Sequence, residues 1–185
     1  MVVLAEYRGY GGIEGPPSVA GVRSDAEAAL EWIRRSTGAP MSRIALYGHS
    51  LGSAVATELA ATHAPEVLLL ESPFSSARDM ARIVIAAPLE RMWRLVSRVH
   101  YDTEARVRTL ETPVWIAHGT DDLIIPFRMG RAVFEAAKTK GTMFPVEGAG
   151  HNDVPDAGGE AYWAWVKRAL NSDGSGVEDL ASPPR

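Results

Sequence analysis

The stretch Tyr47-Gly48-His49-Ser50-Leu51-Gly52 decides the fold of this chain. It follows a short apolar run, residues 44–47, and it precedes a segment rich in helix formers, residues 53–61. A Gly-x-Ser-x-Gly motif between a strand and a helix is typical of the nucleophile elbow, a sharp turn that exposes a reactive serine. The alternative is a chance match in which Ser50 is an ordinary helix cap.

Two glycines flank the serine and fit the elbow interpretation. Gly48 and Gly52 carry no side chain, so the strand and the helix can approach each other closely. We therefore expect Ser50 at the tip of the turn. The N–H of Leu51 would then have no partner within the helix, and it would point to where an oxyanion forms.

The composition is that of a globular domain. The chain has 185 residues, of which 46% are hydrophobic and 23% are charged, enough for one domain with a core. A net charge of −4 gives no indication of nucleic-acid binding. The absence of cysteine excludes disulfides, thiolate metal sites and a cysteine nucleophile.

The sequence contains neither an apolar run long enough to span a bilayer nor the basic start of a signal peptide. We therefore expect a cytoplasmic location, although an upstream segment would change that expectation. The sequence permits membrane contact but contains nothing that supports it.

Apolar segments with the patterns of strands and helices alternate along the chain, which predicts an α/β fold with a mostly parallel sheet and helices on both faces. The expected strands cover residues 2–7, 44–47, 67–71, 113–118 and 142–146, and the expected helices begin at Ser24 or Asp25, at Ser53, at Pro126 and at Ala161. Residues 1–170 would form one domain, and residues 171–185, which have almost nothing to bury, a disordered tail.

Residues 73–101 interrupt this alternation. Leu89, Met92, Trp93 and Val96 recur at helical spacing. One interpretation is a helix packed on the sheet. The other is a helical rim or lid over the site, because the segment follows a strand at the sheet edge where ligands bind in such folds.

A serine hydroxyl is a weak nucleophile, so it needs a base, and the base needs an orienting carboxylate. Asp121 and Asp122 directly follow one expected strand, and His151 follows the next in a glycine-lined loop. The order Ser, Asp, His is the one expected for an elbow enzyme. His118, at the end of a strand, is expected to be structural.

Five motifs stand in the order found in one family of enzymes: Glu6-Tyr7-Arg8-Gly9-Tyr10-Gly11, Gly48-His49-Ser50-Leu51-Gly52, Glu71-Ser72-Pro73-Phe74, His118-Gly119-Thr120-Asp121-Asp122 with Ile125-Pro126, and Gly148-Ala149-Gly150-His151-Asn152-Asp153. On these motifs, residues 2–170 resemble the serine hydrolases of the α/β-hydrolase fold. The similarity is to the small single-domain branch that includes membrane-associated depalmitoylases and uncharacterised bacterial hydrolases.

The resemblance implies a serine hydrolase that cleaves a carboxylic ester or thioester of a small molecule through an acyl-enzyme. It selects Asp122 as the acid beside Ser50 and His151, with Leu51 in the oxyanion hole. No cofactor and no metal would be needed. We expect three further residues of these motifs to contact substrate: His49, Tyr10 and Phe74. The alternatives are a serine peptidase of the same fold and a catalytically impaired domain that acts as a binding module; the oligomeric state is not indicated.

The N-terminal part of the chain departs from the pattern of the family. The family fold begins with strands that this chain lacks, and with them a loop that supplies the second oxyanion-hole N–H. Their absence would leave the elbow strand with an unpaired edge, and unpaired buried backbone groups are costly. We therefore expect Met1 to be an internal start and the working protein to have an upstream segment.

Overall fold

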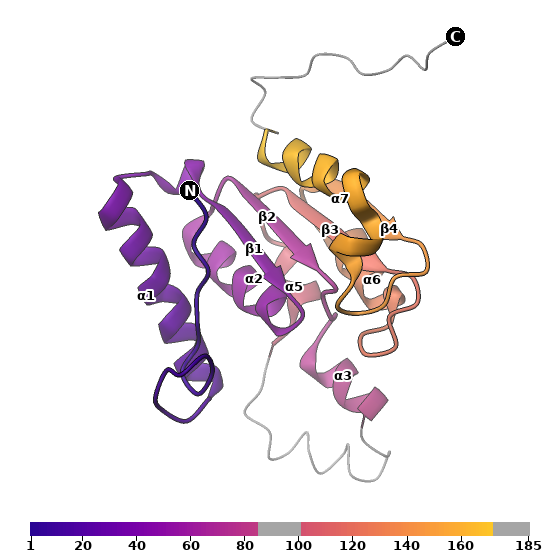
Figure 1. Cartoon of the computed structure of the whole chain (residues 1–185), viewed down its shortest axis with the longest axis horizontal. Coiled ribbons are helices and arrows are strands. Elements are labelled where there is room, and N and C mark those ends of the chain that lie inside the picture. The colour runs from indigo at the N-terminus through magenta and orange to yellow at the C-terminus, as the bar shows by residue number, and fades with distance from the viewer. Residues whose placement is uncertain (85–100, 172–185) are drawn as a thin grey trace.

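The computed structural model of the chain describes residues 1–84 and 101–171 (Figure 1). Its centre is a sheet of parallel strands in the order β1-β2-β3-β4. The strands are β1 (Ala45–His49), β2 (Val67–Glu71), β3 (Val114–Gly119) and β4 (Lys140–Val146). The predicted α/β class and the parallel sheet are therefore confirmed.

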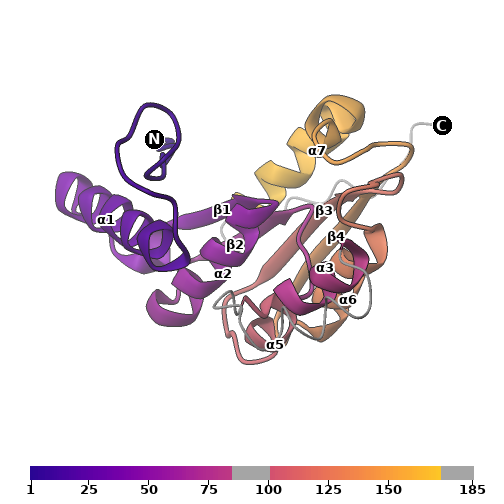
Figure 2. The same cartoon turned by 90° about the horizontal axis from the view of Figure 1, so that it is seen from below.

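Helices cover both faces of the sheet, as predicted. The helical elements are α1 (Val19–Thr37), the 3₁₀ turn η1 (Met41–Arg43), α2 (Leu51–His63), α3 (Ala77–Val84), α5 (Thr103–Val107), α6 (Phe127–Ala136) and α7 (Val154–Leu170). Helix α7 packs on one face, and α2, α5 and α6 pack on the other (Figure 2). Helix α1 packs against α2 beyond β1.

Strand β2 shows why a continuous apolar run suits this sheet. All five of its residues are buried. Leu68 and Leu70 join the apolar cluster formed with α2, α5 and α6, whereas Val67 and Leu69 join the cluster under α7. Because successive side chains of a strand point to opposite faces, a strand covered on both faces needs apolar residues at every position.

The predicted strand at residues 2–7 is wrong. This segment has no regular secondary structure, and the side chains of Val2 and Leu4 are 87% and 89% exposed. An apolar sequence forms a strand only where a neighbouring strand accepts its backbone hydrogen bonds, and within the described residues none pairs with this segment. Strand β1 accordingly lies at one edge of the sheet.

The predicted start of the first helix is also wrong. Helix α1 begins at Val19, where the Oγ of Ser18 accepts the N–H of Gly21 at 3.0 Å as an N-cap. Asp25 lies within α1 and not at its start, and its carboxylate binds Arg8. That carboxylate accepts the Arg8 backbone N–H at 2.9 Å and the guanidinium Nη2–H at 2.5 Å. The ion pair fixes the glycine-rich loop against α1.

The last helix begins earlier than predicted. Helix α7 starts at Val154 rather than at Ala161, and Gly159, with φ of 51° and ψ of −136°, interrupts its helical geometry. Gly159 marks a kink in α7, and the helix predicted to begin at Ala161 corresponds to the part of α7 after this kink. No helix within residues 1–84 and 101–171 is long and apolar enough to cross a membrane.

Two sequence predictions fall largely or wholly on undescribed residues. The predicted rim or lid covers residues 73–101, and residues 85–100 lie outside the described part of the chain. Helix α3, which lies beyond the carboxyl ends of the strands in Figure 1, belongs to its described part. All residues of the predicted tail, 171–185, except Asn171 also lie outside the described residues.

Candidate active site

Ser50 lies at a strained turn between β1 and α2. Its φ of 53° and ψ of −119° are unusual for a residue with a side chain. Two hydrogen bonds hold the turn, because the Ser50 N–H donates to Glu71 O at 3.0 Å and the Ser53 N–H donates to Ser50 O at 3.0 Å. A Cβ at Gly48 would lie 2.2 Å from Gly52 O, so only glycine fits there. This is the geometry of a nucleophile elbow.

The N–H of Leu51 belongs to the first turn of α2. N–H groups in the first turn of a helix have no intrahelical acceptor, and the helix dipole gives that end a partial positive charge. The group is therefore suited to binding an oxyanion formed beside Ser50.

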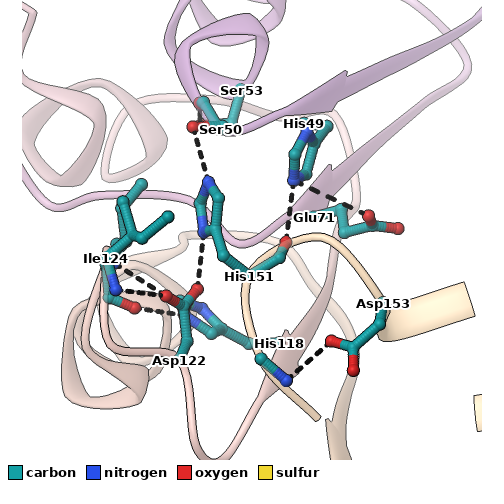
Figure 3. Close-up of polar contacts among 11 residues, drawn as sticks. His49, Ser50, Ser53, Glu71, His118, Asp122, Ile124, His151 and Asp153 are labelled. Carbon is teal, nitrogen blue, oxygen red and sulfur yellow. Dashed lines mark hydrogen bonds and ion pairs between the residues drawn. The ribbon is translucent and has the colours of Figure 1, made fainter. Parts of the chain in front are cut away.

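Asp122 lies in the loop after β3 and is almost fully buried. Its Oδ1 accepts the N–H groups of Ile124 and Ile125 at 2.9 and 2.8 Å, and its Oδ2 accepts from Nδ1 of His151 at 2.7 Å (Figure 3). Burial acts to raise the pKa of Asp122, but the hydrogen bonds from His151 and the two backbone groups outweigh it, so the pKa lies below 3.8. The carboxylate is thus ionised at neutral pH. Asp121, by contrast, is exposed.

His151 lies in the loop after β4, between Asp122 and Ser50. Its Nε2 is 2.9 Å from the Oγ of Ser50, and its ring is largely buried (Figure 3). Because Nδ1 donates to a carboxylate, Nε2 of the neutral ring is an acceptor for the hydroxyl. The serine, histidine and aspartate picked out from the sequence therefore form one continuous hydrogen-bonded chain.

Hydrogen bonds join the histidine loop to the aspartate loop. The Asp121 N–H donates to Ala149 O at 3.0 Å, and the Gly148 N–H donates to the Thr120 Oγ at 2.9 Å. A Cβ at Gly119 would lie 2.3 Å from Ala149 O, so the loops approach each other at backbone distance. The two loops form one support for the acid and the base.

The residues expected to contact substrate lie in three different settings. His49 lies at the end of β1 with its Nε2 3.0 Å from the backbone oxygen of His151. Tyr10 is 57% exposed in the glycine-rich loop. Phe74 is buried in the apolar cluster that includes Val22 and Ala54. Their contact with a substrate stays a prediction.

Sequence analysis missed a polar cluster on the α7 side of β1 and β2. It comprises Tyr47, His49, Glu71 and Tyr162, and its centre is the buried carboxylate of Glu71. The available signal was the acidic residue that ends the apolar run of β2. The other donor is Tyr162 of α7, whose hydroxyl donates to Glu71 at 2.6 Å.

Comparison with known proteins shows which proteins this chain is related to. No family model matches the chain. An uncharacterised protein of Mycobacterium tuberculosis is 36% identical over 170 residues, which are 91% of this chain and 59% of that protein. Alpha/beta hydrolase domain-containing protein 17B of Homo sapiens is 31% identical over 163 residues, 88% of this chain and 52% of that protein. The chain has the α/β-hydrolase fold and is related to these proteins.

Other relatives and solved structures agree with this assignment. Lysophosphatidylserine lipase ABHD12 of Danio rerio is 31% identical over 74% of this chain and 39% of its own length. The esterase RhEst1 from Rhodococcus sp. superposes with a TM-score of 0.65 at 16% identity over 90% of this chain and 78% of its own, which shows a common fold. The chain spans 59% or less of the length of each of these three relatives.

Proposed function

We propose that the chain is a serine hydrolase that cleaves a carboxylic ester or thioester through an acyl-enzyme. The single observation that carries this proposal is the hydrogen-bonded chain from the Oγ of Ser50 through the ring of His151 to Asp122, at 2.9 and 2.7 Å. Lipid and ester substrates are consistent with the names of relatives, since one is a lysophosphatidylserine lipase.

In the proposed reaction, the Oγ of Ser50 attacks the carbonyl carbon while Nε2 of His151 takes the hydroxyl proton. The ionised carboxylate of Asp122 holds the ring in the required tautomer and stabilises the imidazolium. The N–H of Leu51 stabilises the oxyanion. His151 then gives its proton to the leaving alcohol or thiol, and the same steps with water as the nucleophile release the acid.

Fluorophosphonate labelling tests the proposal, because the reagent reacts only with a serine that a neighbouring base activates. The 185-residue chain and the longest natural gene product containing it would be compared, each beside its Ser50→Ala variant. Labelling that disappears in Ser50→Ala is the expected result. Absence of labelling from both folded wild-type forms would refute the hydrolase proposal and favour a binding module.

A substrate panel then separates the esterase from the alternative peptidase. Acyl esters and thioesters of increasing chain length would be compared with peptide substrates. We expect turnover of the acyl compounds, and turnover of peptides alone would show that a serine peptidase is the correct assignment.

A further inference from the structure

Glu71 is a buried carboxylate that the proposed reaction does not use. It ends β2 and is only 4% exposed. Its Oε2 accepts the hydroxyl of Tyr47 at 2.8 Å and the hydroxyl of Tyr162 at 2.6 Å. A buried carboxylate is costly unless it is hydrogen-bonded, so the two phenols make this position tolerable. They also fix the carboxylate between β1 and α7.

The two tyrosines are permanent donors at neutral pH. Burial raises the pKa of Tyr47 and of Tyr162 above 10.0, and the neighbouring carboxylate of Glu71 raises both further. Both phenols therefore stay protonated. Since both donate to the same oxygen, the other oxygen of Glu71, Oε1, is left to face His49.

His49 lies between this carboxylate and His151. It pairs with Glu71 in the parallel register of β1 and β2. Its Nε2 is 3.9 Å from Oε1 of Glu71 and 3.0 Å from the backbone oxygen of His151 (Figure 3). A carbonyl oxygen only accepts, so Nε2 of His49 must carry a hydrogen. The negative charge of Glu71 beside that atom favours the same tautomer.

This contact acts on His151 at a different place from its other partners. Asp122 and Ser50 bind the imidazole, whereas His49 binds the backbone that carries it. The ring centroids of His49 and His151 are 4.9 Å apart, so the two side chains also pack together. The elbow therefore supplies both the nucleophile and, from the preceding residue, a hydrogen bond to the backbone of the base.

We propose that His49 is a positioning residue for the reaction: its Nε2–H binds the backbone oxygen of His151, and the charge of Glu71, fixed by Tyr47 and Tyr162, favours the tautomer of His49 that donates. The inference rests on the proposed hydrolase function. It links α7, through Tyr162, to the placement of the base. A misplacement of about 1 Å can reduce turnover about 10²-fold, so a hydrogen bond to the loop that carries the base can matter for rate.

The first test exchanges the donor on residue 49. His49→Leu keeps apolar bulk without a donor, whereas His49→Gln supplies an amide N–H that can donate to the same carbonyl. We expect kcat for an ester to fall about 10-fold or more in His49→Leu with little change in KM, and to recover to within about 3-fold of wild type in His49→Gln. A role in packing alone would give no such recovery.

A matched control removes another histidine with a carboxylate partner. Nε2 of His63 is 2.6 Å from Glu27, in a pair between α2 and α1 that has no contact with Ser50, Asp122 or His151. His63→Leu should keep the wild-type kcat. Glu71→Gln and Tyr162→Phe, which remove the charge and one phenol donor, should each lower kcat in the same direction as His49→Leu.

A second readout follows the base without turnover. The Nδ1–H of His151, bonded to Asp122, should give a low-field proton resonance that is absent in His151→Gln. We expect it to shift or broaden in His49→Leu and to return in His49→Gln. This measurement needs only a folded protein, and Glu71→Gln provides a third folded variant if His49→Leu does not fold.

The outcomes separate the inference from the function on which it rests. If wild type reacts with fluorophosphonate and folded His49→Leu reacts equally fast with an unchanged His151 resonance, the positioning role is refuted and the hydrolase function stands. If wild type does not react, the hydrolase function is refuted, and the His151 resonance alone tests the positioning role. An unchanged resonance in His49→Leu refutes that role. A resonance that shifts in His49→Leu and returns in His49→Gln supports it.

Discussion

Asparagine in place of Asp122 gives a sharp test of the proposed acid, because the hydrogen bonds around it dictate how the amide must sit. Oδ1 of Asp122 accepts two backbone N–H groups, from Ile124 and Ile125. The NH₂ of an amide cannot accept a hydrogen bond. In Asp122→Asn the amide oxygen must therefore face the two backbone N–H groups, and the NH₂ must face His151. Nδ1 of His151 would then accept, and its Nε2 would carry the hydrogen. That nitrogen could no longer take the proton of Ser50.

The expected loss follows from this tautomer. In a serine protease the corresponding change lowers kcat about 10⁴-fold, equivalent to about 5.4 kcal/mol of barrier. We expect a similar loss in Asp122→Asn, measured as the fluorophosphonate reaction rate and as ester turnover at pH 7. Asp121→Asn is the matched control, because the exposed neighbour should retain wild-type rates. A loss below about 10-fold in folded Asp122→Asn, or equal losses in both variants, would refute the assignment.

Three further predictions concern the fold that holds the site. A methyl group at Gly48 would lie 2.2 Å from a backbone oxygen of α2, so Gly48→Ala should cost about 1–3 kcal/mol in urea unfolding and prevent labelling; an unchanged midpoint would contradict the close approach. Trp165 is fully buried and Trp163 is 56% exposed, so Trp165→Ala should cost about 3–5 kcal/mol and Trp163→Ala no more than about 0.5, whereas equal losses would argue against the described packing of α7. Hydrogen bonds from the neighbouring arginine lower the pKa of Asp25 from 3.8 to about 2, so the ion pair stabilises the fold above pH 3.8 and this contribution is lost as the pH falls through 2. Asp25→Asn should therefore lower the urea midpoint at pH 7 and have little effect near pH 2; a deficit that persists at low pH would exclude the charge as its cause.

The sequence predicted the elements whose signals are local. The run from Val67 to Leu70 is apolar at every position because helices cover both faces of β2, and the close approach of the backbone at Gly48 requires a glycine there. The segment at residues 2–7 shows where local reasoning fails. Its composition is that of a strand, but pairing depends on a neighbour elsewhere, and the described residues provide none.

The candidate site was partly predictable because its residues directly follow strands that have local sequence signals. Parallel strands end at one edge of the sheet, so residues that follow successive strands meet there, as Ser50, Asp122 and His151 do. Residue spacing alone did not separate Asp121 from Asp122, and the resemblance to a family did. The cluster around Glu71 was not predicted, because the acidic end of β2 was its one signal and no motif links this residue to Tyr162, its donor 91 residues further along the chain.

A third histidine, His118, lies beside Asp122 but does not compete with His151 for the charge of this carboxylate. His118 is fully buried, its Nε2 donates to Ile125 O at 2.8 Å, and the same atom is 3.3 Å from Oδ2 of Asp122. A charged imidazole there would compete with the imidazolium of His151 for the same carboxylate. Burial lowers the pKa of His118 below 6.5, so its ring is neutral at pH 7. Gly130 packs directly on that ring, where a Cβ would lie 2.1 Å from Nδ1, and Nδ1 is buried. The negative charge of Asp122 is therefore available to stabilise the proton that His151 receives from Ser50 in the proposed reaction.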